Sequence, residues 1–153
     1  MRVLITGTSS GIGKAIAEKF LKEGFDVTGF DRKEASISQD SYTHFCLDIR
    51  DREQYPALAP FDIVINNAGV QNENDIDINL KGTIAITEAY GIHDNIRAIL
   101  MIGSAPARPA AIPELSFRNT RQARAVCSPT RKTWHSALHR MVERATALIS
   151  AAY

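Results

Sequence analysis

The chain reads Thr6-Gly7-Thr8-Ser9-Ser10-Gly11-Ile12-Gly13 directly after a short apolar run, Val3-Leu4-Ile5, and before a segment with helical periodicity. A strand, a glycine-rich turn and a helix N-terminus point backbone N–H groups and the positive end of a helix dipole at one spot. Gly7 permits the turn, Gly11 lets the backbone approach a pyrophosphate, and Gly13 lets the helix pack closely on the sheet. Because the stretch lies between a strand and a helix, it predicts a phosphate-binding turn rather than an ordinary connection.

The length and composition of the chain predict one folded domain. Its 153 residues suffice to bury a core, and no apolar run is long enough to span a bilayer, so we expect no membrane partner. Arg2-Val3-Leu4-Ile5 runs straight into the glycine-rich turn, which leaves no room for a signal peptide. Cys46 and Cys127 have neither a metal-binding nor a redox spacing. We therefore expect no metal site and a cytoplasmic protein with reduced thiols.

The charge of the chain changes sign near its C-terminal quarter. Residues 1–117 hold 11 basic and 16 acidic residues, a net charge of −5, whereas residues 118–153 hold seven basic residues and one acidic residue, a net charge of +6. This contrast predicts a nucleotide-binding domain over 1–117 and a basic, atypical tail over 118–153. Apolar residues from Trp134 to Ile149 recur at helical spacing, so we expect part of the tail to be helical. The arginines lack interleaved aromatic residues, which favours a solvated loop over a nucleic-acid site.

Strand-like and helix-like segments alternate along residues 1–103. The strand predictions are 3–5, 26–30, 42–46, 62–66 and 97–103, and the helix predictions are 12–23 and 75–90. Residues 51–60 are predicted as a short helix that Pro56 and Pro60 break. This alternation predicts an α/β protein, with a Rossmann-like doubly wound parallel sheet of about five strands in the order 3-2-1-4-5. Ligands of such sheets bind at the carboxyl ends of the strands.

Polar residues follow the predicted strands at that end of the sheet. Asp31 stands 18 positions after Gly13, where a carboxylate accepts hydrogen bonds from the ribose hydroxyls of NAD and repels the 2′-phosphate of NADP. Arg32 directly follows and can accommodate that phosphate, so NADP stays the less favoured alternative. Asp48 is placed to accept a hydrogen bond from an adenine amino group. His44 alternates within a strand, which favours a structural role over a catalytic one.

Taken together, these motifs resemble the short-chain dehydrogenase/reductase family over roughly residues 1–105. Thr6–Gly13 resembles the cofactor loop of the family, and Asn66-Asn67-Ala68-Gly69 resembles its Asn-Asn-Ala-Gly motif, although only ten residues separate Gly69 from Asn79. The resemblance implies hydride transfer between NAD and a small carbonyl or alcohol substrate. Asn79 would hold a water of the proton relay, and Ser104 would orient the substrate oxygen. The expected cofactor contacts are Gly7, Ser9, Ser10, Gly11, Ile12, Gly13, Asp31, Asp48, Ile49, Asn67, Ala68 and Gly69.

The sequence departs from the family in its proton-transfer half. The family places a tyrosine about 13 residues after its serine and a lysine four residues further, but Phe117 and Arg121 stand there, and no Tyr-x-x-x-Lys occurs. The tyrosine is the general acid or base, so we expect catalysis to be lost or very weak. The alternatives are a non-catalytic NAD-binding module and an inert truncated product. The last strands of the family fold would be missing, which predicts an exposed fifth strand and a homo-oligomer unless the tail covers it.

The neighbouring reading frame offers an explanation for this departure. After back-translation, the junction of Asn119 and Thr120 allows Tyr, and the next two junctions allow Ala or Ser. The junction of Gln122 and Ala123 allows Ser, and that of Ala123 and Arg124 allows Lys. The degenerate codons of the shifted frame then permit Gly-Gly-Leu-Leu-Ala-Tyr-Thr-Lys-Asn-Leu, which is similar to the catalytic helix of the family. The hypothesis is a frameshift between Ser104 and Asn119, followed by an out-of-frame tail.

Overall fold

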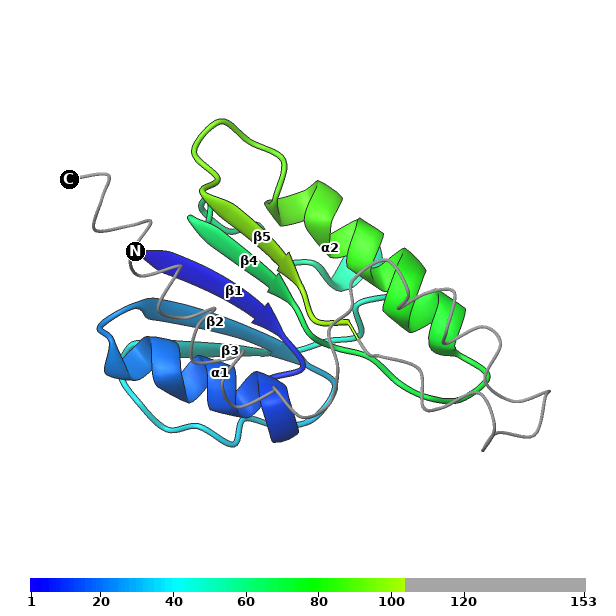
Figure 1. Ribbon diagram of the computed structural model, residues 1–153, viewed down its shortest axis with the longest axis horizontal. Helices are drawn as coiled ribbons and strands as arrows, with labels where there is room; N and C mark the ends of the chain where they lie inside the picture. Colours follow the sequence, from blue (N-terminus) through cyan, green and yellow to red (C-terminus); the bar gives the residue numbers. More distant parts are fainter. Residues whose placement is uncertain (104–153) are drawn as a thin grey trace.

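The computed structural model describes residues 1–103, which form a parallel sheet flanked by helices (Figure 1). Its five strands run in the order β3-β2-β1-β4-β5, as the sequence predicted. Every neighbouring pair is parallel. The strands are β1 (Arg2–Thr6), β2 (Asp26–Asp31), β3 (Tyr42–Cys46), β4 (Ile63–Asn66) and β5 (Ala98–Met101), and the α-helices are α1 (Gly11–Lys22) and α2 (Thr83–Tyr90).

Two apolar clusters cover the two faces of this sheet. Val3 and Ile5 of β1 belong to the cluster that contains the buried side of α1, whereas Leu4 belongs to the cluster that contains Ile86 of α2. Side chains alternate between the faces of a strand, so a central strand with helices on both sides needs an unbroken apolar run. Figure 1 shows α1 and α2 flanking the sheet. The apolar run before the glycine-rich turn is therefore the middle of the core.

The buried face of α1 determines where the helix begins relative to β1. Its buried residues recur at helical spacing (Ile16, Ala17, Phe20 and Leu21). Gly24 ends the helix with a φ of +82° and donates its N–H to the Leu21 carbonyl oxygen at 3.0 Å. The packing of α1 holds its N-terminus at the carboxyl end of β1.

The structure refines two of the helix predictions. Within 51–60 only one turn of 3-10 helix forms, η1 (Arg52–Gln54), because Pro56 and Pro60 supply no backbone N–H to continue a helix. Within 75–90 the first half is a π-helix, η2 (Ile76–Gly82), which continues into α2. The predicted boundary at residue 118 lies outside the described residues.

Candidate functional site

A cleft of about 620 Å³ opens at the carboxyl ends of the strands. This volume lies within the range of pockets that hold small ligands and cofactors. Its wall combines the β1–α1 turn, the ends of β2 and β3, the β4 loop, η2 and the residues after β5. The lining residues are Gly7, Ser10, Gly11, Ile12, Phe30, Asp31, Arg32, Lys33, Leu47, Asp48, Ile49, Asn67, Ala68, Gly69, Val70, Ile78, Ile102 and Gly103.

The N-terminus of α1 contributes unpaired backbone donors to this cleft. Ser10 caps the helix in an extended conformation, but its side chain makes no capping hydrogen bond. The first intrahelical bond runs from Lys14 N to Ser10 O. The N–H groups of the first turn consequently have no helical acceptor, and that turn contains no acidic residue. With the positive end of the helix dipole, they form an anion-binding position.

The turn itself is locked against β4 through Thr6 and Asn67. Thr6 Oγ1 accepts hydrogen bonds from the N–H groups of Asn67 and Ala68, each at 3.0 Å. The Asn67 side-chain amide donates to the carbonyl oxygens of Thr6 at 3.0 Å and Gly7 at 3.3 Å. A Cβ on Gly13 would lie 2.0 Å from the Gly7 oxygen and 2.4 Å from Asn67 Nδ2. Glycine at position 13 therefore permits the contact between the helix, the turn and the β4 loop.

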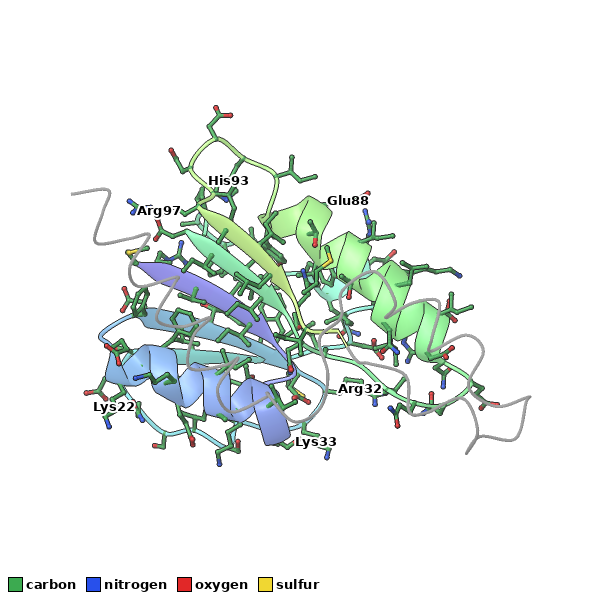
Figure 2. The ribbon with its side chains drawn as sticks, viewed as in Figure 1. Lys22, Arg32, Lys33, Glu88, His93 and Arg97 are labelled. Atoms are coloured by element: carbon green, nitrogen blue, oxygen red, sulfur yellow. The ribbon has the colours of Figure 1, made fainter. Side chains whose placement is uncertain are left out.

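Asp31 ends β2 with its carboxylate held by two backbone donors. Oδ2 accepts from Ser9 N at 2.9 Å, and Oδ1 accepts from Lys33 N at 3.0 Å. A carboxylate oxygen has two lone pairs, so each oxygen keeps an acceptor position after these bonds. Arg32 and Lys33 lie beside it on the same cleft (Figure 2). The strand end thus offers a fixed negative charge next to two basic side chains.

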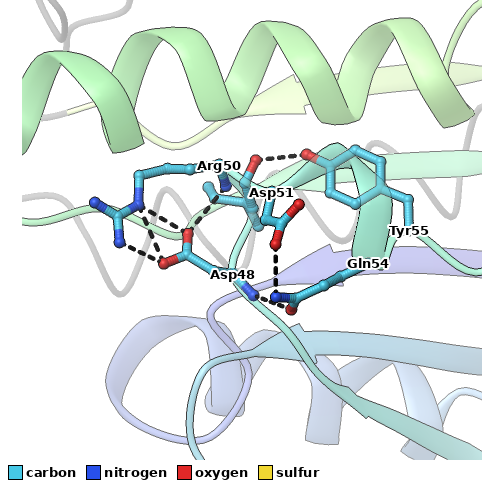
Figure 3. Close-up of polar contacts among 6 residues, drawn as sticks. Asp48, Arg50, Asp51, Gln54 and Tyr55 are labelled. Carbon is cyan, nitrogen blue, oxygen red and sulfur yellow. Dashed lines mark hydrogen bonds and ion pairs between the residues drawn. The ribbon is translucent and has the colours of Figure 1, made fainter.

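Asp48 is already paired with a neighbouring arginine. Arg50 donates to Asp48 Oδ1 through its backbone N and Nε at 2.9 and 3.0 Å, and its terminal nitrogen lies 2.6 Å from Oδ2 (Figure 3). These hydrogen bonds hold the pKa of the Asp48 carboxyl below its usual range. Beside it, the Tyr55 hydroxyl donates to the Ile49 carbonyl oxygen at 2.5 Å. An adenine amino group at this position would meet an ionised carboxylate that Arg50 holds in place.

Asn79 lies within the π-helix, and its side chain is paired with the backbone of Val70. Its Oδ1 accepts from Val70 N and its Nδ2 donates to Val70 O, both at 2.8 Å. The pair fixes the loop after Gly69 against η2, and π-helical turns often occur at functional sites. The Oδ1 and Nδ2 atoms of Asn79 each keep one further hydrogen-bonding position. The expected role of Asn79 in holding a water stays a prediction.

The cleft brings together most of the residues that the sequence singled out. Ser9 and Gly13 lie behind its wall, where they support Asp31 and the turn, and Ser104 lies outside the described residues. Sequence reasoning did not include the apolar wall residues Leu47, Val70, Ile78 and Ile102. Val70 and Ile102 directly follow the recognised motif and the last strand, so extending each segment by a residue or two would have found them.

Two absences hold for residues 1–103. No helix there is long and apolar enough to cross a bilayer. No cluster of three or more His, Cys, Asp or Glu side chains within that range has the arrangement of a metal site.

The sequence of the chain is similar to that of several oxidoreductases. The 3-oxoacyl-(acyl-carrier-protein) reductase of Buchnera aphidicola is 34% identical over 93 residues, which cover 52% of this chain and 38% of that protein. D-erythrulose reductase of Gallus gallus is 27% identical over 139 residues, 80% of this chain and 54% of that protein. The chain therefore spans only part of the length of these relatives.

The fold is shared with solved structures of dehydrogenases. Serine dehydrogenase from Escherichia coli has a TM-score of 0.67 and 26% identity, and covers 82% of this chain and 71% of its own. A closed form of serine dehydrogenase complexed with NADP⁺ has a TM-score of 0.69 and 26% identity, with coverage of 82% and 62%. A family model described as short chain dehydrogenase matches residues 1–102. Since this match spans two thirds of the 153 residues, the chain belongs to the short-chain dehydrogenase family.

Proposed function

We propose that this chain binds NAD in the cleft at the carboxyl ends of its strands. The observation that carries the proposal is the pairing of two features across one cleft: the open N-terminus of α1 and the Asp31 carboxylate, which two backbone N–H groups hold in place. The first suits a pyrophosphate and the second suits ribose hydroxyls. A dinucleotide contains both groups at a fixed separation.

The remaining wall fits the rest of such a cofactor. Asp48 and Ile49 line the part of the cleft beyond Asp31, where adenine would lie, while Asn67–Gly69 and Ile102–Gly103 line the opposite part, where nicotinamide would lie. When bound, the cofactor would supply or accept a hydride. The residues of the chain would bind and orient it, and Ser104, the next residue after this wall, would orient the oxygen of a carbonyl or alcohol substrate.

The preference for NAD over NADP depends on Asp31. A 2′-phosphate placed against this carboxylate would be repelled by about 1–3 kcal/mol at a separation near 5 Å, and Arg32 and Lys33 would offset part of that cost. We expect calorimetric titration of the full chain to give tighter binding of NADH than of NADPH. The Asp31→Asn variant should shift the ratio of the two dissociation constants toward NADPH by about tenfold. Asp40→Asn, with the same charge change at an exposed position off the cleft, is the control. Equal ratios in both variants would contradict the assignment.

We propose that hydride transfer by this chain is lost or very weak. Phe117 and Arg121 stand where the family has its tyrosine and lysine, and removing a general acid or base costs typically 10²- to 10⁴-fold in rate. Sequencing the coding DNA between the codons for Gly103 and His135 tests the frameshift hypothesis. A Tyr-Ala-Ala-Ser-Lys reading in the neighbouring frame supports it, and a neighbouring frame without that motif refutes it.

The absent Tyr-x-x-x-Lys also favours a second candidate, a non-catalytic NAD-binding module. Titration with NAD combined with an assay of alcohol oxidation separates the cases. Binding without turnover supports the module, and clear turnover overturns the assignment of lost catalysis. If the chain neither binds NAD nor shows turnover, the remaining alternative is an inert truncated product.

A further inference from the structure

Two side chains of the edge strand β3 reach the β1–α1 turn over the neighbouring strand β2. The Tyr42 hydroxyl oxygen lies 2.8 Å from Thr8 Oγ1 and 2.9 Å from His44 Nδ1. His44 Nε2 lies 2.9 Å from the Lys33 carbonyl oxygen, which also accepts from Ser9 Oγ at 3.1 Å. The hydrogen bonds thus form a closed ring from the turn through β3 to the segment after β2.

A glycine in the middle of β2 leaves the space for this ring. A Cβ on Gly29 would lie 2.2 Å from the Tyr42 hydroxyl oxygen and 2.4 Å from Thr8 Oγ1. Glycine weakens the interior of a strand, because it packs no side chain and loses much conformational entropy on folding. Its presence here is explained by the close approach of Tyr42 to Thr8.

The ring is complete in both charge states of its histidine. A carbonyl oxygen only accepts, so the bond to Lys33 places a proton on His44 Nε2 in either state. With a charged imidazole, Nδ1 donates to Tyr42 and Tyr42 donates to Thr8. With a neutral imidazole, Thr8 donates to the Tyr42 hydroxyl, which in turn donates to His44 Nδ1. Burial raises the pKa of Tyr42, so its hydroxyl keeps its proton at neutral pH, and the fully buried Thr8 always has a partner.

The ring fixes the two segments whose backbones hold Asp31. Ser9 N donates to one carboxylate oxygen and Lys33 N to the other, so a shift of either segment would turn the carboxylate. Ser9 and Lys33 are also joined to the ring, through the Ser9 hydroxyl and the Lys33 carbonyl. Tyr42 and His44 are not among the residues of the cleft wall, so they act on a bound ligand only through these segments.

We propose that Tyr42 and His44 form a positioning pair that holds the Asp31 carboxylate in place for the adenosine ribose of the cofactor. The inference rests on the proposed NAD site. It adds a specific role for two residues of β3 that contact no ligand. Removing either side chain weakens the binding of ligands that carry this ribose.

The test is calorimetric titration of the full chain with ADP-ribose, which carries the adenosine and pyrophosphate groups and no nicotinamide. Tyr42→Phe keeps the aromatic side chain and removes its hydroxyl, and His44→Phe removes both imidazole nitrogens. Each should raise the dissociation constant about three- to tenfold, as expected for the loss of a buried hydrogen bond. Tyr90→Phe is the matched control, because the Tyr90 hydroxyl donates one hydrogen bond to Pro56 O at 2.9 Å and Tyr90 is not among the residues that line the cleft.

The control separates a positioning role from a structural one. Titrations are run well below the unfolding temperature of every variant, so a mere loss of stability leaves the dissociation constant unchanged. Weaker binding in both β3 variants, with unchanged binding in Tyr90→Phe, supports the inference. Unchanged binding in Tyr42→Phe or His44→Phe overturns the positioning pair while the proposed function stands. If the unaltered chain does not bind ADP-ribose, both proposals fail. If Tyr42→Phe does not fold, His44→Phe decides by the same criterion.

Discussion

Replacing Gly13 by alanine tests how the cofactor turn is built. Gly13 lies in the first turn of α1, and in a helix interior alanine is normally favoured over glycine by about 1 kcal/mol. Propensity alone therefore predicts that Gly13→Ala stabilises the protein. The packing predicts the opposite, because the added Cβ would lie 2.0 Å from the Gly7 carbonyl oxygen and 2.4 Å from Asn67 Nδ2.

The cost follows from what would have to move. Gly7 is held by its N–H bond to the Phe30 carbonyl oxygen at 2.7 Å, so the backbone cannot yield freely. The Asn67 amide would also have to move away from Thr6 O and Gly7 O, at about 0.5–1.5 kcal/mol for each lost hydrogen bond. Overpacking adds about 1–3 kcal/mol. After the gain in helix propensity is subtracted, Gly13→Ala should lower the free energy of unfolding by about 3 kcal/mol.

Urea denaturation of the full chain measures this change. Gly24→Ala is the control: its φ is +82° and nothing lies near the added Cβ, so only backbone strain of about 1–2 kcal/mol is expected. The midpoint for Gly13→Ala should fall further than that for Gly24→Ala, with the slope unchanged. A Gly13→Ala protein that is as stable as the unaltered chain, or more stable than Gly24→Ala, would refute the packing argument.

Three further changes test other parts of the structure. Thr6→Val removes the acceptor of two partly buried N–H groups in the β4 loop and should cost about 1–3 kcal/mol in urea denaturation. Thr6→Ser keeps the hydroxyl and should lose much less; equal losses would contradict the bonding. Arg50→Gln should raise the pKa of Asp48 toward its ordinary value in an NMR titration. The lowered pKa means that the stabilisation by this pair is present above the unfolded value near 4 and is lost as the pH falls through the folded value. Burial raises the pKa of Tyr55 and Tyr90 to about 12, so an ultraviolet titration should show both hydroxyls ionising well above pH 10. The stability that these neutral hydroxyls contribute is present below pH about 10 and should be lost as the pH rises through about 12. Ionisation of both near 10 would contradict their burial.

The sequence predicted the sheet because its signals were local and redundant. The apolar run before Gly7, the glycine spacing and the polar residue after each strand all point to parallel strands with ligands at one edge. The strand order and the parallel pairing were confirmed. A short helix within 51–60, broken by Pro56 and Pro60, was predicted, and one turn of 3-10 helix forms there before Pro56.

The fine structure of the site depends on contacts between distant residues. Apolar spacing predicted a helix over 75–90, but it did not reveal the π-helical hydrogen bonds of its first half or the pairing of Asn79 with Val70. Likewise, the sequence favoured a structural role for His44 without identifying its partners. Strand alternation puts His44 on the same face as Tyr42, but only the pairing of β3 with β2 places both beside Gly29.

The central claim is that the cleft at the strand ends binds a nicotinamide dinucleotide. Titration of the isotope-labelled full chain with NAD, followed by the amide NMR signals, tests it most directly. We expect saturable shifts that are largest at Gly11, Ile12, Ser9 and Lys33, whose backbones form the anion position and hold Asp31. An absence of saturable shifts, or shifts centred on the charged hollow between Arg52 and Lys81, would contradict the account.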